Sequence, residues 1–420
     1  KCGNAGRKPD GHYLMSPGHC AHNHYTAATR PRTSFMAGWL FLFVSLAGTA
    51  IVINAAKPLR GPISIVPGWL LAFLTLDLAL FHIGVALLLA GGFALAGALD
   101  GWPGKLALML TLASSAVLLV LWLPSLRAAS IADAVASELE LDEVERIPRN
   151  LLLRPIPRVR DGVSVLRDVP FARRDGRVLA MDIYRGSGHG GRRPGLVFLH
   201  GGGWCLGDKR EQGLPLCNHL ASLGWVCANA NYRLSPGATY PDHVDDATSA
   251  VAWLREHADD YGVDPDFIAI AGNSAGAHIA AMTALTGNSV QAIVTFYGVY
   301  DLTNRLGVHG SAFLKRLIGP HVLKAFFDTE PERFHAASPM DHVERASSPW
   351  LIMQGDRDSL TPAPEAREFA RRLREHSKPV VGYAELPGAQ HAFDIYYSLR
   401  TFATVELAAR FLVTAYRRVR

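Results

Sequence analysis

Charged side chains are almost absent from a long stretch of the chain before residue 127, and this absence limits the fold more than any other feature. Residues 36–56 and residues 106–123 contain no charged side chain at all. A helix needs roughly 20 apolar residues to cross the hydrocarbon core of a bilayer, and each run has about that length. The overall hydrophobic content of 49% is also high for a chain that lies wholly in water. We therefore expect an α-helical transmembrane region over residues 35–127.

A third apolar run covers residues 63–99, and only Asp77 and His82 within it can ionise. As a single helix it would be about 55 Å long, which is more than a simple crossing needs. We interpret it as one span over about residues 67–90, broken at Gly91-Gly92, which makes about three spans in all. Two short spans are the alternative. Five residues turn a helix by about 140° beyond a full turn, so Asp77 and His82 point to different sides. Both are expected to pack against neighbouring spans.

The residues before the first run are polar and irregular, and residues 1–34 are predicted to be a disordered leader. Cysteine and histidine are frequent in it, but their spacing matches no common metal-ligand pattern. Its basic residues outnumber those of the loop after the first run, so the positive-inside rule favours a cytoplasmic N-terminus. Three crossings then place the rest of the chain outside the cytoplasm, whereas four would return it inside. The basic residues compared are Lys1, Arg7, Lys8, Arg30 and Arg32 in the leader and Lys57 and Arg60 in the loop.

Net charge and cysteine content argue against two other classes of protein. The chain has 42 Lys and Arg against 37 Asp and Glu, and the basic residues are scattered rather than grouped with aromatic residues. This pattern does not support nucleic-acid binding. The five cysteines form no CxxC pair, so a disulfide framework is not expected. A single bridge within the group Cys205, Cys217 and Cys227 stays open.

After residue 127 the composition of the sequence changes twice. Residues 128–160 are predicted to be an amphipathic connector, acidic at first and then rich in proline and arginine. From residue 161 to the end, short apolar runs alternate with helical patterns, which predicts a mostly parallel, eight-stranded sheet flanked by helices. The expected strands are 163–166, 178–184, 196–200, 226–231, 267–271, 292–296, 350–354 and 380–386. The expected helices are 243–257, 275–285, 364–376 and 399–416.

The sequence Gly272-Asn273-Ser274-Ala275-Gly276 lies between an expected strand and an expected helix. A G-x-S-x-G pattern in this setting is typical of a sharp turn that exposes a nucleophilic serine, with glycines tolerating the crowding. The pattern alone is weak, and its strand-turn-helix context is what makes Ser274 a candidate nucleophile. The free N–H groups at the start of the following helix favour developing negative charge.

A glycine-rich sequence, His200-Gly201-Gly202-Gly203-Trp204, follows the strand at 196–200. Backbone N–H groups of Gly202 and Gly203 are unshielded, and Ala275 offers a third behind the candidate nucleophile. Together they are expected to form an oxyanion hole. A flexible turn or a phosphate-binding loop is the alternative. Nucleotide binding is disfavoured, because the sequence here has neither the Lys-Ser/Thr pair nor the G-x-G-x-x-G pattern that begins a helix in nucleotide-binding loops.

A nucleophilic serine needs a base and an acid that orients the base. His391 follows the strand at 380–386, and Asp356 and Asp358 follow the strand at 350–354. Both loops emerge at the carboxyl edge of the sheet, as Ser274 does, and the order Ser, Asp, His is the one this architecture uses. We expect His391 to be the base and Asp358, in preference to Asp356, to be the acid. His278 is expected to pack structurally.

From about residue 163 to the end, the chain resembles the α/β-hydrolase superfamily, in particular carboxylesterases of the hormone-sensitive-lipase-like and feruloyl-esterase-like groups. Anchored esterases with such N-terminal helices occur in actinobacteria, and plant prenylcysteine methylesterases are membrane-anchored relatives. One departure is Asn273, where hormone-sensitive-lipase-like enzymes usually carry Asp. The resemblance rests on five motifs in order: residues 200–204 with 207–209, 231–236, 272–276, 355–362 and 388–393.

The resemblance implies a serine carboxylesterase with Ser274, Asp358 and His391 as its triad and Gly202, Gly203 and Ala275 as oxyanion donors. It implies a small-molecule ester as substrate and no metal or organic cofactor, and the apolar runs imply a lipid bilayer as partner. Amide or formamide cleavage is an alternative within enzymes, and a non-catalytic membrane-tethered receptor is an alternative of another class. Residues 301–342 are where caps are inserted in this fold. Their large apolar residues, Phe313, Leu317, Phe326 and Phe327, are expected to line an acyl pocket or to join the core.

Overall fold

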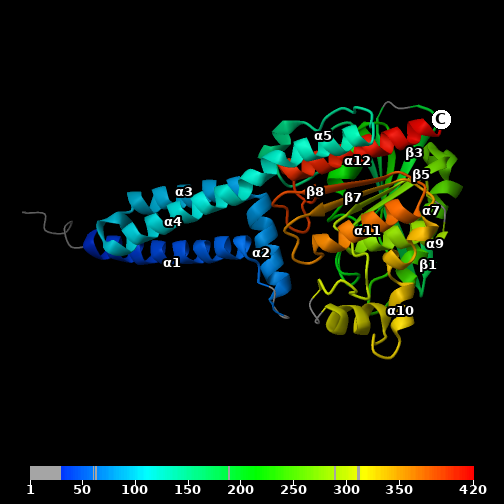
Figure 1. Cartoon of the computed structure of the whole chain (residues 1–420). Coiled ribbons are helices and arrows are strands. Elements are labelled where there is room, and N and C mark those ends of the chain that lie inside the picture. Colours follow the sequence, from blue (N-terminus) through cyan, green and yellow to red (C-terminus); the bar gives the residue numbers. More distant parts are fainter. Residues whose placement is uncertain (1–29, 60, 62–63, 188–189, 288–289, 310–312) are drawn as a thin grey trace, which may run out of the picture.

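The computed structural model describes residues 30–420 except residues 60, 62–63, 188–189, 288–289 and 310–312. A bundle of long helices extends from one side of a larger part built around a sheet (Figure 1). Helix α1 (Arg30–Ala56) begins inside the stretch expected to be a leader. The rest of that stretch, with its cysteines and histidines, lies outside the described residues.

The bundle consists of α1, α3 (Ala79–Leu95) and α4 (Trp102–Trp122). Two stretches, Thr33–Ala56 and Trp102–Glu138, are long and apolar enough to cross a membrane, and a bent helix pair makes a third if it counts as one span. Hydroxyl pairs join α1 to α4 inside the bundle, with 2.9 Å between Ser45 and Thr111. Large apolar side chains cover much of its outside, among them Leu88 and Leu95.

The third apolar run does not break where the sequence suggested. Helix α3 continues through Gly91 and Gly92, and the break lies at Leu78, where α2 (Ile65–Asp77) meets α3 at 84°. The expectation for Asp77 is also wrong, because its carboxylate pairs at 3.2 Å with Arg400 of the sheet-centred part. At this bend α2 thus packs against the sheet-centred part through Asp77. His82 lines a cavity of about 550 Å³ between α1, α3 and α4.

The expected eight-stranded sheet is confirmed, with strand order β1-β2-β4-β3-β5-β6-β7-β8. The pairs β1–β2 and β2–β4 are antiparallel, and every later pair is parallel. The parallel strands are buried along most of their length, as expected for strands covered on both faces. The strands are β1 (Val163–Arg174), β2 (Arg177–Gly186), β3 (Arg193–Leu199), β4 (Val226–Ala230), β5 (Val263–Asn273), β6 (Ile293–Phe296), β7 (Trp350–Gly355) and β8 (Val381–Leu386).

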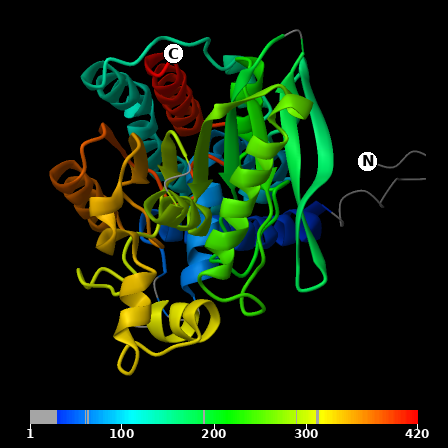
Figure 2. The ribbon, with the colours of Figure 1, turned by 90° about the vertical axis from the view of Figure 1, so that its right-hand side faces the viewer.

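Helices cover both faces of the sheet, and each face has its own apolar core (Figures 1 and 2). One face carries α7 (Asp242–Glu256), α9 (Ala275–Gly287) and α11 (Ala363–His376); the other carries α5 (Ala128–Glu138), α6 (Leu214–Ser222) and α12 (Leu399–Arg418). The apolar side of α5 is buried beside α12, so the beginning of the expected connector joins the core. The shorter helices are α8 (Ala258–Tyr261), α10 (Pro331–Ala336), the π-helix η4 (Phe313–Leu323) and the 3-10 turns η1 (Ala98–Asp100), η2 (Leu123–Arg127), η3 (Arg149–Leu153), η5 (Pro339–Asp341) and η6 (Val343–Arg345).

The three cysteines of the sheet-centred part are free thiols, so no bridge forms within the group Cys205, Cys217 and Cys227. Cys217 and Cys227 are fully buried, and they contribute to the core as small apolar side chains do.

Candidate active site

Ser274 lies at the tip of the turn between β5 and α9, with φ at +53°. A side chain other than glycine adopts this backbone conformation only where the surroundings impose it. The turn requires glycine on both sides of Ser274, because a larger side chain there would overlap the backbone. A Cβ on Gly272 would lie 2.4 Å from the carbonyl oxygen of Gly276, and one on Gly276 would lie 2.1 Å from that of Leu199. The turn is thus packed tightly enough to hold Ser274 in its strained conformation.

The structure brings Ser274, His391 and Asp358 into one hydrogen-bonded line. His391 Nδ1 lies 2.7 Å from Asp358 Oδ2, and His391 Nε2 lies 2.9 Å from Ser274 Oγ. With Nδ1 donating to the carboxylate, Nε2 is left as an acceptor for the serine hydroxyl. His391 and Asp358 are both buried, whereas Ser274 is partly exposed. This arrangement can remove a proton from a hydroxyl that substrate can reach.

Asp358 is held by four donors besides His391. Backbone N–H groups of Leu360 and Thr361 donate to Oδ1 at 2.9 and 2.8 Å. The Thr361 hydroxyl and the Gln354 amide donate to Oδ2 at 2.8 and 3.1 Å. These bonds fix the carboxylate in one position. The roles of Thr361 and Gln354 were not predicted from the sequence, although Thr361 lies in the motif at residues 355–362.

Asp356, the other candidate acid, points elsewhere. Within the described residues it makes no hydrogen bond to His391, and burial raises the pKa of its carboxyl. Its carboxyl instead accepts a hydrogen bond from the backbone N–H of Gly388.

The glycine-rich loop after β3 lies against the serine turn. A Cβ on Gly201 would come within 2.9 Å of Ser274 Cβ, so the loop approaches as closely as glycine allows. Gly202 and Gly203 have φ values of +125° and +59°. No hydrogen bond between described residues uses their N–H groups, which leaves both free to donate to a bound oxygen. The base of the loop is fixed by Tyr232, whose hydroxyl donates to the His200 carbonyl at 2.9 Å.

His278, expected to pack structurally, does so beside this loop. Its Nδ1 accepts from the Trp204 indole at 3.2 Å, and its Nε2 lies 2.8 Å from the Ala337 carbonyl. Burial lowers its pKa to about 4, so the ring stays neutral near pH 7. A neutral ring matches this pattern of one acceptor and one donor nitrogen.

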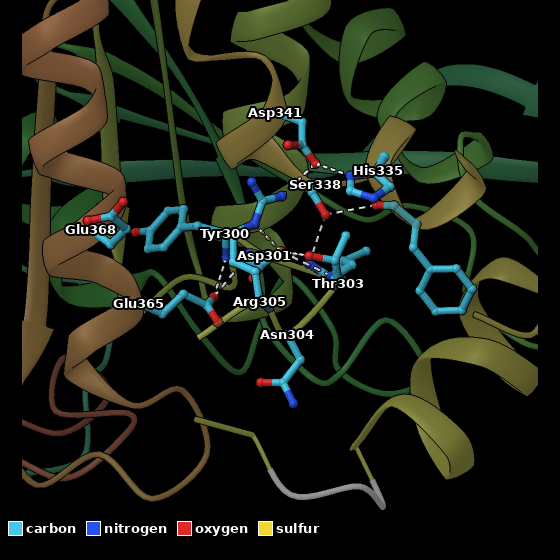
Figure 3. A network of polar contacts seen from close by, with 12 residues as sticks. Tyr300, Asp301, Thr303, Asn304, Arg305, His335, Ser338, Asp341, Glu365 and Glu368 are labelled. Carbon is cyan, nitrogen blue, oxygen red and sulfur yellow. Dashed lines mark hydrogen bonds and ion pairs between the residues drawn. The ribbon is translucent and has the colours of Figure 1, made fainter. Parts of the chain in front are cut away.

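The cap residues 301–342 are fastened to the sheet-centred part by a polar network (Figure 3). Glu365 of α11 accepts from the N–H groups of Tyr300 and Asp301 at 2.6 and 3.2 Å, where the segment leaves the sheet. Arg305 then pairs with Asp341 at 2.6 Å, near the other end of the segment. These contacts hold the two ends of the cap close together.

The four large apolar residues of the cap have different surroundings. Leu317 borders the glycine loop, with its Cδ2 atom 3.8 Å from where a Cβ on Gly203 would lie. Phe327 packs edge-on against Phe334 at a ring distance of 5.3 Å, and Phe326 is exposed. The side chain of Phe313 lies outside the described residues. Of the three whose side chains are described, Leu317 is therefore the one that borders the glycine loop.

A second buried carboxyl, Asp394, lies beside His391 and was not predicted from the sequence. Tyr297 donates its hydroxyl to Asp394 Oδ1, and Asn273 donates to the Tyr297 oxygen at 3.0 Å. The Tyr297 ring lies 4.4 Å from the imidazole of His391. Asn273, the residue that departs from the family pattern, thus serves this network through its amide. Burial raises the pKa of Asp394 to about 6 from 3.8.

We expect Asp394→Asn to stabilise the protein at pH 7.5. The folded-state pKa exceeds the unfolded one, so between about pH 4 and pH 6 the unfolded chain ionises first. The free energy of unfolding then falls as pH rises through that window and stays low above it. Asparagine keeps an acceptor for Tyr297 without a charge, and the gain at pH 7.5 should reach up to about 3 kcal/mol, at about 1.4 kcal/mol per pKa unit. Thermal unfolding of both proteins at pH 7.5 and pH 4 measures this; equal gains at the two pH values would contradict it.

The sequence matches the BD-FAE family over residues 181–373, a range that contains Ser274 and Asp358 and ends before His391. It is 38% identical over 266 residues to the esterase LipQ of Mycobacterium tuberculosis, covering 60% of this chain and 62% of LipQ. An acetyl esterase of Salmonella paratyphi B is 30% identical over 237 residues, covering 52% of this chain and 71% of that protein.

A solved structure, Thermogutta terrifontis esterase 2 phosphonylated by sarin, is similar at a TM-score of 0.52 and 28% identity. The match covers 61% of this chain and 96% of that one. The chain spans less than two thirds of the length of LipQ, whereas it spans more than two thirds of the acetyl esterase. Shared sequence over 71% of the acetyl esterase, together with the structural similarity to the Thermogutta esterase, shows that the chain belongs to the α/β-hydrolase carboxylesterases.

Proposed function

We propose that the chain hydrolyses carboxylic esters through an acyl-enzyme on Ser274. The observation that carries the proposal is the hydrogen-bonded line from Ser274 through His391 to Asp358, on a strained turn that faces free N–H groups. The esterase names of the relatives support the same reaction class. Phosphonylation of the Thermogutta esterase by sarin supports the expectation that an organophosphorus probe reacts here too.

Each residue has a defined role in the proposed reaction. His391 Nε2 takes the proton of Ser274 Oγ as the oxygen attacks the ester carbonyl. The N–H groups of Gly202, Gly203 and Ala275 hold the negative oxygen of the tetrahedral intermediate. The imidazolium, stabilised by Asp358, then returns the proton to the leaving alcohol. In the second half of the reaction His391 takes a proton from water, the water oxygen attacks the acyl-enzyme, and the proton returns to Ser274 Oγ as the acid is released.

We also propose that the helix bundle anchors the enzyme in a membrane. Two helices of sufficient length and hydropathy, and the bent pair as a third, support three crossings. With a cytoplasmic N-terminus, the catalytic part then lies outside the cytoplasm, at the cell membrane. The substrates proposed for this location are small esters or lipid esters.

Ser274→Ala should abolish ester hydrolysis and leave folding intact, because the partly exposed hydroxyl contributes little packing. Loss of a triad nucleophile typically costs several orders of magnitude in kcat. A panel of p-nitrophenyl esters of graded chain length, run beside amide analogues, measures the loss and the substrate preference. A fluorophosphonate probe should label Ser274 in the wild type and nothing in the variant. Ester turnover by pure Ser274→Ala protein would refute the assignment.

Asp358→Asn should lower kcat far more than Asp356→Asn, because Asp358 is the one of these two aspartates that lies beside Nδ1 of His391, at 2.7 Å. An amide at position 358 can donate to Nδ1 and so favour the wrong tautomer, which typically costs about 10⁴ in kcat. Asp356→Asn is the matched control, with the same change of charge in the same loop. Steady-state kinetics on one ester compares them, and the opposite ranking would move the acid to Asp356.

A C-terminal fusion to a reporter active only outside the cytoplasm should give signal, and a fusion to one that fluoresces only inside should not. The reason is that an odd number of crossings separates the termini. Signal from the cytoplasmic reporter alone would reverse the topology and indicate an even number of crossings.

A further inference from the structure

Helix α2 belongs to the apolar N-terminal region, yet one of its sides lies against the catalytic part (Figure 1). Trp69, Phe73 and Asp77 follow one another at intervals of four residues, so they share a side of the helix. All three contact residues of the segment 387–400, which contains His391. The catalytic function proposed above makes this segment the carrier of the general base.

Trp69 contacts His391 itself in two ways. Its indole Nε1 donates to the backbone carbonyl of His391 at 3.3 Å, and its ring meets the imidazole edge-on at 5.7 Å. The two imidazole nitrogens are engaged by Asp358 and Ser274. Trp69 therefore contacts the parts of His391 that these two partners leave free, namely its backbone carbonyl and its ring.

Two further contacts from α2 fix the loop on either side of His391. Asp77 pairs with Arg400 at 3.2 Å, both side chains almost fully buried, and the Arg400 guanidinium donates to the Pro387 carbonyl at 3.4 Å. Phe73 stacks on Tyr396 at a ring distance of 5.7 Å. A buried ion pair and an aromatic stack thus brace the loop before and after the imidazole.

We propose that α2 completes the active site and that Trp69 is a positioning residue for His391. This inference rests on the proposed esterase function. A misplacement of about 1 Å at a reacting group can cost about 10²-fold in rate. Because Trp69 acts on the base and not on the bound substrate, its loss should lower kcat and leave KM unchanged.

The test uses the full chain in detergent, with Trp69→Phe as the variant. Phenylalanine keeps a ring beside the imidazole but removes the N–H that reaches the carbonyl. The matched control is Trp102→Phe, since Trp102 is an exposed residue of the bundle that pairs with Trp39 at 5.2 Å. The measurements are kcat and KM for a short-chain p-nitrophenyl ester, the rate of fluorophosphonate labelling, and the melting temperature.

We expect Trp69→Phe to lower kcat and the labelling rate together by about tenfold, with KM and melting temperature close to wild type. Trp102→Phe should match wild type in all four. Wild-type rates in Trp69→Phe, with or without a lower melting temperature, would overturn the proposal, and so would an equal loss in the control. A wild-type protein that neither hydrolyses esters nor reacts with the probe would instead refute the function on which the proposal rests.

Discussion

Parallel strand pairing is the constraint on which the candidate site depends. It aligns the carboxyl ends of β3, β5, β6, β7 and β8 at one edge, with Leu199 beside Gly272 and Gly355 beside Leu386 at the last paired positions. The glycine loop, the serine turn and the loops of Asp358 and His391 all leave from this edge. Residues 117 positions apart in the sequence, Ser274 and His391, can therefore share a hydrogen bond.

The same strand order also places the loop that carries His391 far from Ser274. Strand β8 lies three strands from β5, which is about 14 Å at 4.8 Å per strand. The histidine loop must extend back across β7 and β6 to meet Ser274, and a loop that extends this far has few main-chain partners in the sheet. Its support comes from outside the sheet, from Asp358 and Tyr297 on one side and from α2 and Arg400 on the other.

The sequence was sufficient to predict the sheet, most element positions and the residues that line up at the carboxyl edge. Those predictions rest on local patterns, namely strand and helix periodicity and loops placed after strands. The role of α2 could not be read in this way. Trp69 and Phe73 look like lipid-facing residues in an apolar run, and Asp77 looks like a group paired within the bundle. Long-range contacts with His391, Tyr396 and Arg400 show otherwise, and the helix that makes them ends at the bend at Leu78 and not at Gly91-Gly92. Asp394 was equally hidden, because nothing local distinguishes a buried aspartate from a surface one.

If the bundle anchors the enzyme in a membrane as proposed, the 84° bend between α2 and α3 sets where the candidate site lies relative to the bilayer. When α3 stands along the normal of a bilayer, α2 lies nearly flat along its surface. The imidazole of His391 contacts both Trp69 of that helix and the Ser274 hydroxyl. Ser274 would then lie further from the lipid than one helix diameter, roughly 10 Å, because the imidazole lies beyond the helix. Esters that partition into the bilayer would arrive by diffusion in two dimensions, at a local concentration set by the membrane and not by the surrounding water.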